Sequence, residues 1–264
     1  MKLGIIAQPV EASFQMAARR GLDFLEFCIN EGNDGQELYN NRQLIKQWVN
    51  EYGIGVQSIG RWKSERIDAR GHLLQDELEI CYRLIDVASE LGCTNFVSGC
   101  NYVKELSYYE NCTAAINFFS KLIEYGKIKG VTMSTYNCRK VNFVHNPLAW
   151  TMIHGHLSDL GIKFDPSHSR YFGGDYLQET KEWGHRFNHV HLKGSLMING
   201  ERIDDPPAGL DQTDWKTFIA LLRVKGYEGG LSIEPHSPIW SGELGDQGID
   251  YTVSYMNELL FRTR

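Results

Sequence analysis

Short apolar segments alternate with longer amphipathic segments along all 264 residues of the chain. The apolar segments are rich in β-branched and aromatic residues, as buried parallel strands are. We predict eight strands, at residues 3–6, 24–27, 54–58, 95–97, 131–136, 162–165, 189–192 and 230–233. We predict helices at residues 12–19, 43–52, 77–91, 114–127, 147–156, 176–187, 215–225 and 251–260.

The helical segments show the three-and-four spacing of one apolar face, and several end at a glycine, which favours a helix C-terminus. Eight strand-helix units without a linker predict one domain, residues 1–264, folded as a single (β/α)8 TIM barrel of the α/β class. A doubly wound open sheet usually carries a glycine-rich phosphate turn after an early strand. The loop after Ile6 reads AQPVEAS, so this alternative and a nicotinamide or flavin site lack support.

The amino-acid composition argues against some classes of binding partner. The chain is 42% hydrophobic, and its 27 Lys and Arg residues against 33 Asp and Glu residues give a net charge of -6. An acidic chain is not attracted to the negatively charged phosphate backbone of a nucleic acid, so we expect no nucleic acid partner. The start MKLGIIAQPV is too short for a secretion signal, and no apolar run is long enough for a bilayer. We therefore expect a soluble, cytoplasmic protein whose six scattered cysteines are thiols, mostly buried.

Three segments place potential metal ligands at the ends of successive predicted strands. They read GIKFDPSH with Asp165 and His168, HVHLK with His191, and LSIEPH with Glu234. In a barrel these strand ends meet on one face. Asp165, His191 and Glu234 are therefore predicted to bind one divalent cation, which could be Mn, Zn, Mg, Co or Fe. Each residue alone has an ordinary structural explanation, such as a helix N-cap for the aspartate.

His189 and His191 share one face of their strand because side chains alternate with a period of two. His191 lies nearer the C-terminal rim of the barrel, so we expect it to be the ligand. We expect His189 to be a core residue or a partner behind the ligands.

These motifs resemble a known superfamily. FDPSH, HVHLK, DDPPAGLDQTDW and GYEGGLSIEPH are similar to the C-terminal half of the xylose-isomerase-like TIM barrels, the sugar phosphate isomerase and epimerase family. GLDFLEF and ELGCTNFVSG extend the resemblance to the N-terminal half. It implies a divalent metal held by Glu, Asp, His and Glu from strands five to eight, with two Glu carboxylates exchanging a proton beside a carbonyl.

The chain departs from this pattern at strand five. Asp165, His191 and Glu234 match the last three ligands, but Tyr136 followed by Asn137 stands where the family has Glu-Asn. One metal ligand and one base are therefore missing. A one-base reaction then remains, in which Glu234 abstracts a proton and His168, Tyr136 or a water returns it.

Several other side chains are predicted to face the site, and the function stays open among related classes. The expected substrate-binding residues are Asn137, Tyr136, Lys193, Arg202, His236 and Trp62. The resemblance implies a divalent-metal-dependent isomerase or epimerase of a small sugar or keto-sugar derivative. The alternatives are a lyase or dehydratase acting beside a keto group of a sugar or inositol derivative, and a non-catalytic sugar-binding barrel with an incomplete metal site. The substrate, the metal and any homo-oligomer remain open.

Overall fold

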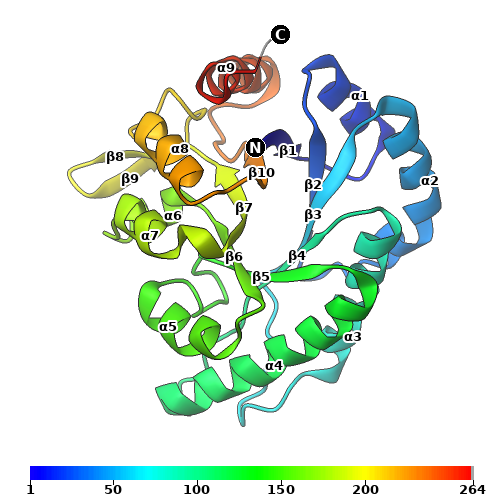
Figure 1. Cartoon of the computed structure of the whole chain (residues 1–264), viewed down its shortest axis with the longest axis vertical. Coiled ribbons are helices and arrows are strands. Elements are labelled where there is room, and N and C mark those ends of the chain that lie inside the picture. Colours follow the sequence, from blue (N-terminus) through cyan, green and yellow to red (C-terminus); the bar gives the residue numbers. More distant parts are fainter. Residues whose placement is uncertain (263–264) are drawn as a thin grey trace.

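A closed ring of eight parallel strands forms the centre of the computed structural model, which describes residues 1–262 (Figure 1). The barrel strands are β1 (Lys2–Ile6), β2 (Phe24–Asn30), β3 (Gly55–Trp62), β4 (Asn95–Ser98), β5 (Thr132–Tyr136), β6 (Leu160–Phe164), β7 (Phe187–Leu192) and β10 (Gly230–Ile233). They follow one another around the ring in chain order, and β10 closes it against β1. This arrangement confirms the predicted (β/α)8 TIM barrel.

Helices surround the ring on all sides (Figure 1). They are α1 (Glu11–Arg19), α2 (Gln36–Tyr52), α3 (Gln75–Glu90), α4 (Tyr108–Lys129), α5 (Pro147–His156), α6 (Pro166–Tyr171), α7 (Tyr176–Trp183), the 3-10 helix η1 (Gly184–Arg186), α8 (Trp215–Val224) and α9 (Gly242–Leu260). No helix within residues 1–262 is long and apolar enough to cross a bilayer. The six cysteines are free thiols, four of them buried, as the sequence predicts.

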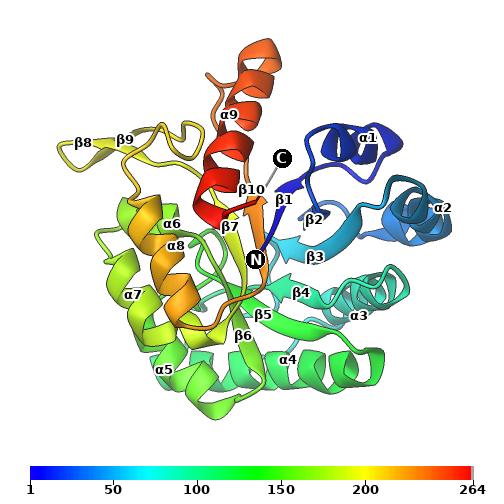
Figure 2. The ribbon, with the colours of Figure 1, turned by 45° about the horizontal axis from the view of Figure 1, so that its top comes forward.

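All eight predicted barrel strands are present, and two elements between them were not foreseen. The short helix α6 follows β6 directly, and an antiparallel hairpin of β8 (Leu196–Ile198) and β9 (Glu201–Asp204) extends from the loop after β7 (Figure 2). Both are only a few residues long, so their sequences carry too little periodicity for recognition. Helix α4 also begins earlier than predicted, because Ser107 and Glu110 form a capping box at its start.

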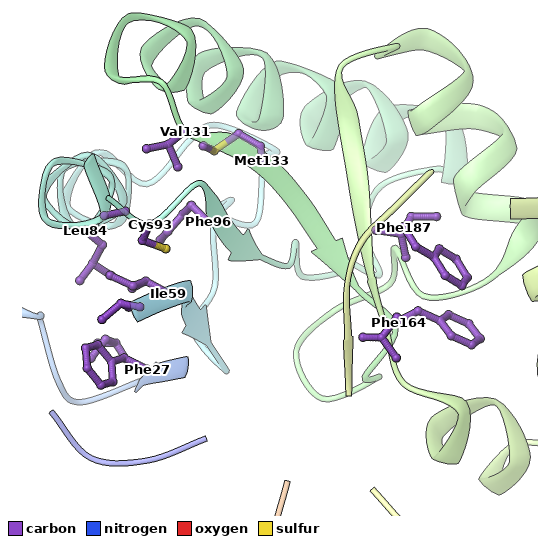
Figure 3. Close-up of a cluster of buried hydrophobic side chains, with 14 of the residues drawn as sticks. Phe27, Ile59, Leu84, Cys93, Phe96, Val131, Met133, Phe164 and Phe187 are labelled. Atoms are coloured by element: carbon purple, nitrogen blue, oxygen red, sulfur yellow. The ribbon is translucent and has the colours of Figure 1, made fainter. Parts of the chain in front are cut away.

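The apolar core lies between the strands and the surrounding helices. Figure 3 shows Leu84 of α3 against Ile59 of β3, and Phe164 beside Phe187. The rings of Phe164 and Phe187 stack with their centroids 4.5 Å apart. Packing of these outward-facing side chains fixes each strand and thereby aims the alternate residues into the barrel.

The inside of the barrel is unusually polar. TIM-barrel interiors are mostly filled by branched apolar residues. Here Ser134 donates to Asn95 over 2.6 Å, Asn95 donates to Ser58 over 3.3 Å, and Asn188 donates to Ser134 over 3.1 Å. Because buried polar groups need partners, this network stabilises the buried side chains of Ser58, Asn95 and Ser134 in the lower part of the interior. The charged residues described below occupy the layers above it.

We predict that His154 makes the stability of the fold depend on pH. It is buried in α5, where Nε2 lies 2.9 Å from the Thr135 hydroxyl and Nδ1 lies 3.0 Å from the Leu160 carbonyl oxygen. Burial lowers the pKa of His154 from 6.5 to about 4. Between these values the unfolded chain binds a proton that the folded protein does not. The free energy of unfolding should therefore fall as pH drops from 6.5 toward 4, by about 3 kcal/mol at most from this residue.

Urea unfolding at several pH values measures this effect. His154→Gln should reduce the pH dependence over that range, whereas His156→Gln, on the exposed side of the same helix, should leave it unchanged. An unchanged slope in His154→Gln would show that other groups cause the acid sensitivity.

Candidate active site

A cavity of about 260 Å³ opens at the C-terminal ends of the barrel strands. Trp62, Tyr136, His168, Lys193 and Glu234 are among the side chains that line it. They come from the ends of β3, β5, β7 and β10 and from α6, which is where TIM barrels build their active sites. The sequence predicted all five residues to be at the site.

Asp165, His191 and Glu234 come together beside this cavity. One potential ligand atom from each lies within 4.8 Å of the others. Asp165 is fully buried at the start of α6, where its Oδ1 accepts hydrogen bonds from the backbone and hydroxyl of Ser167. Asp165 is thus both an N-cap and a member of the charged cluster.

A lysine ammonium lies within ion-pair distance of two members of this group. The Nζ atom of Lys193 lies 3.0 Å from Asp165 Oδ2 and 3.6 Å from Glu234 Oε2. It also donates a hydrogen bond to Nε2 of His168 over 3.1 Å. Lys193 is 2% exposed and lines the cavity, whereas Asp165 does not. The lysine therefore separates Asp165 from the cavity.

The charges shift the pKa values of these groups in the directions expected for an ion-pair network. Burial raises the pKa of Asp165, but attraction to Lys193, together with smaller contributions from His168 and Lys163, outweighs it and holds that pKa well below its usual range. Burial lowers the pKa of Lys193, while Asp165 and Glu234 together raise it above its usual value. Burial and the neighbouring Lys193 lower the pKa of His168 to about 3. Near neutral pH the site therefore holds carboxylates, an ammonium group and a neutral His168.

A second charged layer lies beneath the first. Nε2 of His191 lies 3.0 Å from both oxygens of Glu26, and Nε2 of His189 lies 2.8 Å from Glu26 Oε2. The other nitrogen of His191, Nδ1, lies 2.7 Å from Glu234 Oε2. Burial raises the pKa of Glu26, but the two histidines lower it well below the usual value. His191 thus links the carboxylate of β2 to the carboxylate after β10.

Glu26 is a central residue that the sequence analysis missed. Its signal was an acidic residue within the apolar stretch FLEFCI, at an inward position of the strand. His189 was expected in the core or behind the ligands, and it lies there as a buried partner of Glu26.

The residues do not fit a divalent ion in the arrangement they adopt. The three expected ligands converge, yet the Lys193 ammonium lies within ion-pair distance of Asp165 and Glu234. Both nitrogens of His191 already face carboxylate oxygens. An ion bound by this set would have to displace the lysine, because the two cations would repel each other at contact distance. We therefore derive no step through a metal.

Tyr136 occupies the place of the expected fourth ligand. Its ring is 1% exposed and stacks on Trp62, with ring centroids 4.3 Å apart. Together they form an apolar wall of the cavity, with Cys28 and Cys138 packed against them. This wall offers a surface for the carbon skeleton of a ligand rather than a charged donor.

Three residues expected to bind substrate have other contacts in the structure. Asn137 donates to the Asp165 carbonyl oxygen over 2.8 Å and accepts from the Asp165 backbone N–H over 2.9 Å, so it positions Asp165. Arg202 forms an ion pair with Asp205 and lies over the Tyr171 ring, outside the residues that line the cavity. His236 lines the cavity, but its Nδ1 lies 2.8 Å from Asp205 Oδ2.

We predict that Glu26→Ala destabilises the protein severely. Removing one member of a buried ion pair leaves its partners uncompensated, and the expected loss is about 3–5 kcal/mol in the free energy of unfolding. Chemical denaturation of Glu26→Ala and of Glu31→Ala, an exposed position next to the end of the same strand, measures it. Equal losses in the two variants would show that Glu26 is not needed to compensate the histidines.

Comparisons with known proteins agree with the fold. The family model described as "Xylose isomerase-like TIM barrel" matches residues 14–257. The uncharacterized protein YfiH of Bacillus subtilis (strain 168) is 26% identical over 164 residues, which are 54% of this chain and 52% of that protein. The match to this curated relative thus spans about half of its length.

Solved structures share the barrel across nearly the whole chain. A xylose isomerase domain protein from Planctomyces limnophilus has a TM-score of 0.79 at 15% identity, covering 98% of this chain and 96% of that one. A D-allulose 3-epimerase from Methylomonas sp. has a TM-score of 0.77 at 18% identity, covering 98% of each. The probable 3-DHS dehydratase AsbF from Bacillus anthracis has a TM-score of 0.76 at 13% identity, covering 97% and 99%. At these identities the likeness shows the fold, while the family model covers most of the chain, so this protein belongs to the xylose isomerase-like TIM barrel family.

Proposed function

We propose that this protein is an isomerase or epimerase of a small sugar or keto-sugar derivative, acting by removal of the proton beside a carbonyl group. The observation that carries this proposal is the carboxylate of Glu234, which lines the cavity at the C-terminal mouth of the barrel and is held there by cations. Membership in a family whose solved relatives include a sugar epimerase and a dehydratase supports the same class.

Glu234 has the placement of a general base. Its side chain is 18% exposed, and Oε2 is held 2.7 Å from Nδ1 of His191. Among residues 1–262, no side chain or backbone group donates to Oε1, so this oxygen is open to a substrate proton. Burial raises the pKa of Glu234, but Lys193 and His191 lower it well below the usual value. The group is therefore ionised at neutral pH, as a proton acceptor must be.

Lys193 supplies the positive charge for the other half of the reaction. When Glu234 takes a proton from carbon, the electron pair moves onto the carbonyl oxygen, and a fixed cation at that oxygen lowers the barrier. The Lys193 ammonium lies 3.6 Å from Glu234 Oε2 and borders the same cavity, so it can face that oxygen. Neutral His168, hydrogen-bonded to Lys193, is placed to carry a proton between substrate oxygens.

A single base fits isomerisation better than inversion. Glu234 is the one carboxylate among the residues lining the cavity within the described chain, and Tyr136 stands on the β5 side. One base can carry a proton between neighbouring carbons on one face of the substrate, whereas inversion at one carbon needs an acid on the opposite face. One base with a separate acid also supports elimination beside a keto group, so a lyase is the second candidate.

We predict that Glu234→Gln abolishes proton exchange. Wild-type protein incubated with keto-sugars in D₂O should incorporate deuterium at the carbon beside the carbonyl, as measured by NMR. Loss of a general base should slow this incorporation by about 100- to 10,000-fold. Glu228→Gln, an exposed change just before β10, serves as the control and should exchange at the wild-type rate. Exchange by Glu234→Gln at the wild-type rate would contradict the assignment of the base.

We predict that the protein works without a divalent metal. Elemental analysis of protein purified without chelator should show far less than one metal per chain, and EDTA should not slow the deuterium incorporation. Lys193→Met should then lower the exchange rate because the cation beside the carbonyl is lost.

The metal hypothesis drawn from the sequence makes the opposite prediction. Near-stoichiometric metal in the wild type that is lost in Glu234→Ala would establish a metal site that needs Glu234, and would overturn the role given to Lys193. No exchange with or without added metal would instead favour a binding protein.

A further inference from the structure

Lys163 is a buried cation without a carboxylate partner. It is 1% exposed, and no Asp or Glu among residues 1–262 lies within ion-pair distance of its ammonium group. The other buried cations within residues 1–262 are paired: Arg61 and Arg66 share Glu77, and Lys193 contacts Asp165 and Glu234. Lysine is rarely buried this completely unless it is paired.

The position of Lys163 directs it toward the cavity. It lies on β6 two residues before Asp165, so both side chains point into the barrel. Lys163 lines the cavity, and its ammonium lies 5.2 Å from the ring centroid of Trp62. This contact with an aromatic face compensates only part of the loss of water. Asp165 and Glu234 attract the ammonium from beyond ion-pair distance, and an anion entering the cavity would give it a direct partner.

Lysines predominate among the charged residues that line the cavity. Lys63, Lys140, Lys163 and Lys193 line it, whereas Glu234 is the one carboxylate among the lining residues of the described part of the chain. The whole chain has a net charge of -6, so this excess of lysines does not follow from its composition. Lys63 and Lys140 are exposed at the mouth, where they can draw an anion inward, and Lys163 lies deeper.

We propose that the substrate is a sugar anion, whose carboxylate or phosphate group is bound by Lys163. This inference rests on the proposed function, because the anion would be the molecule from which Glu234 removes a proton. A cavity of about 260 Å³ has room for more than an ion, and the wall of Trp62 and Tyr136 contacts the carbon skeleton. Lys163 then fixes one end of the substrate, while Glu234 and Lys193 act at its carbonyl.

Three keto-sugars with one skeleton test the proposal: D-fructose, D-fructuronate and D-fructose 6-phosphate. Calorimetric titration of the wild type should show at least one of the two anions binding about 10- to 100-fold more tightly than the neutral sugar, the range expected of a charged hydrogen bond. The anion that gains affinity identifies carboxylate or phosphate as the group recognised.

Substitutions of Lys163 test whether this residue causes the preference for anions. Lys163→Met should bind all three sugars with similar, weak affinity, and Lys163→Arg should retain the preference because it keeps the charge. Lys181→Met, an exposed change on α7, is the control and should behave as wild type. Thermal unfolding of each variant shows whether it is folded. If Lys163→Met does not fold, Lys163→Gln, which keeps a polar side chain without the charge, takes its place and should lose the anion preference in the same way.

Two results would overturn the proposal: equal wild-type affinity for the three sugars, or an anion preference that persists in folded Lys163→Met. Failure of the anion-site proposal can be distinguished from failure of the proposed reaction. Glu234→Gln tests the reaction through deuterium incorporation, and Lys163→Met tests the anion site through affinity alone.

Discussion

The contacts of Lys193 with Asp165 and Glu234 allow the mouth of this barrel to keep charges away from water. An isolated carboxylate or ammonium in such a place would shift its pKa and become neutral. Here one ammonium lies within 3.6 Å of both carboxylates. Each charge lowers the free energy of the others, so all three groups stay ionised. The geometry of the site therefore depends on this lysine more than on any single hydrogen bond.

The ion pairs do not end at Lys193. Glu234 contacts His191, and His191 contacts Glu26, which also holds His189. Charges connected in this way respond as a unit, so replacement of one member changes the protonation of its neighbours. This coupling explains why Glu26, which does not itself line the cavity, matters to a base at the cavity wall. It also explains why β2, β7 and β10, distant in sequence, must keep their relative register.

The sequence revealed the fold and the main side chains because both follow from short-range rules. Buried parallel strands read as apolar runs, and parallel strand ends meet on one face, which was enough to bring Asp165, His191 and Glu234 together. The pairings could not be read in the same way. Lys193 reaches Asp165 across 28 residues of sequence, and Glu26 meets His191 across 165. Such contacts depend on side-chain directions that only the closed barrel defines.

The same limit explains Asn137 and Lys163. The position of Asn137 after β5 suggested a substrate ligand, but its amide is satisfied by the backbone of Asp165 on the neighbouring strand. The sequence did not single out Lys163 within GIKF, and only the ring of strands shows that it points into the cavity without an ion-pair partner among residues 1–262.

The unpaired charge of Lys163 is informative because stability alone would select against it. Burial of a charge without an ion-pair partner destabilises a folded protein by several kcal/mol, and contact with an aromatic face offsets about 0.5–2 kcal/mol of this loss. Asp165 and Glu234 attract the Lys163 ammonium from beyond ion-pair distance, so its charge is only partly compensated in the ligand-free protein. An anion that enters the cavity would give this ammonium a direct partner, so part of the binding free energy would come from completing the compensation of a charge that is already buried. A neutral sugar of the same shape would gain nothing from Lys163, which makes this residue a source of discrimination as well as affinity.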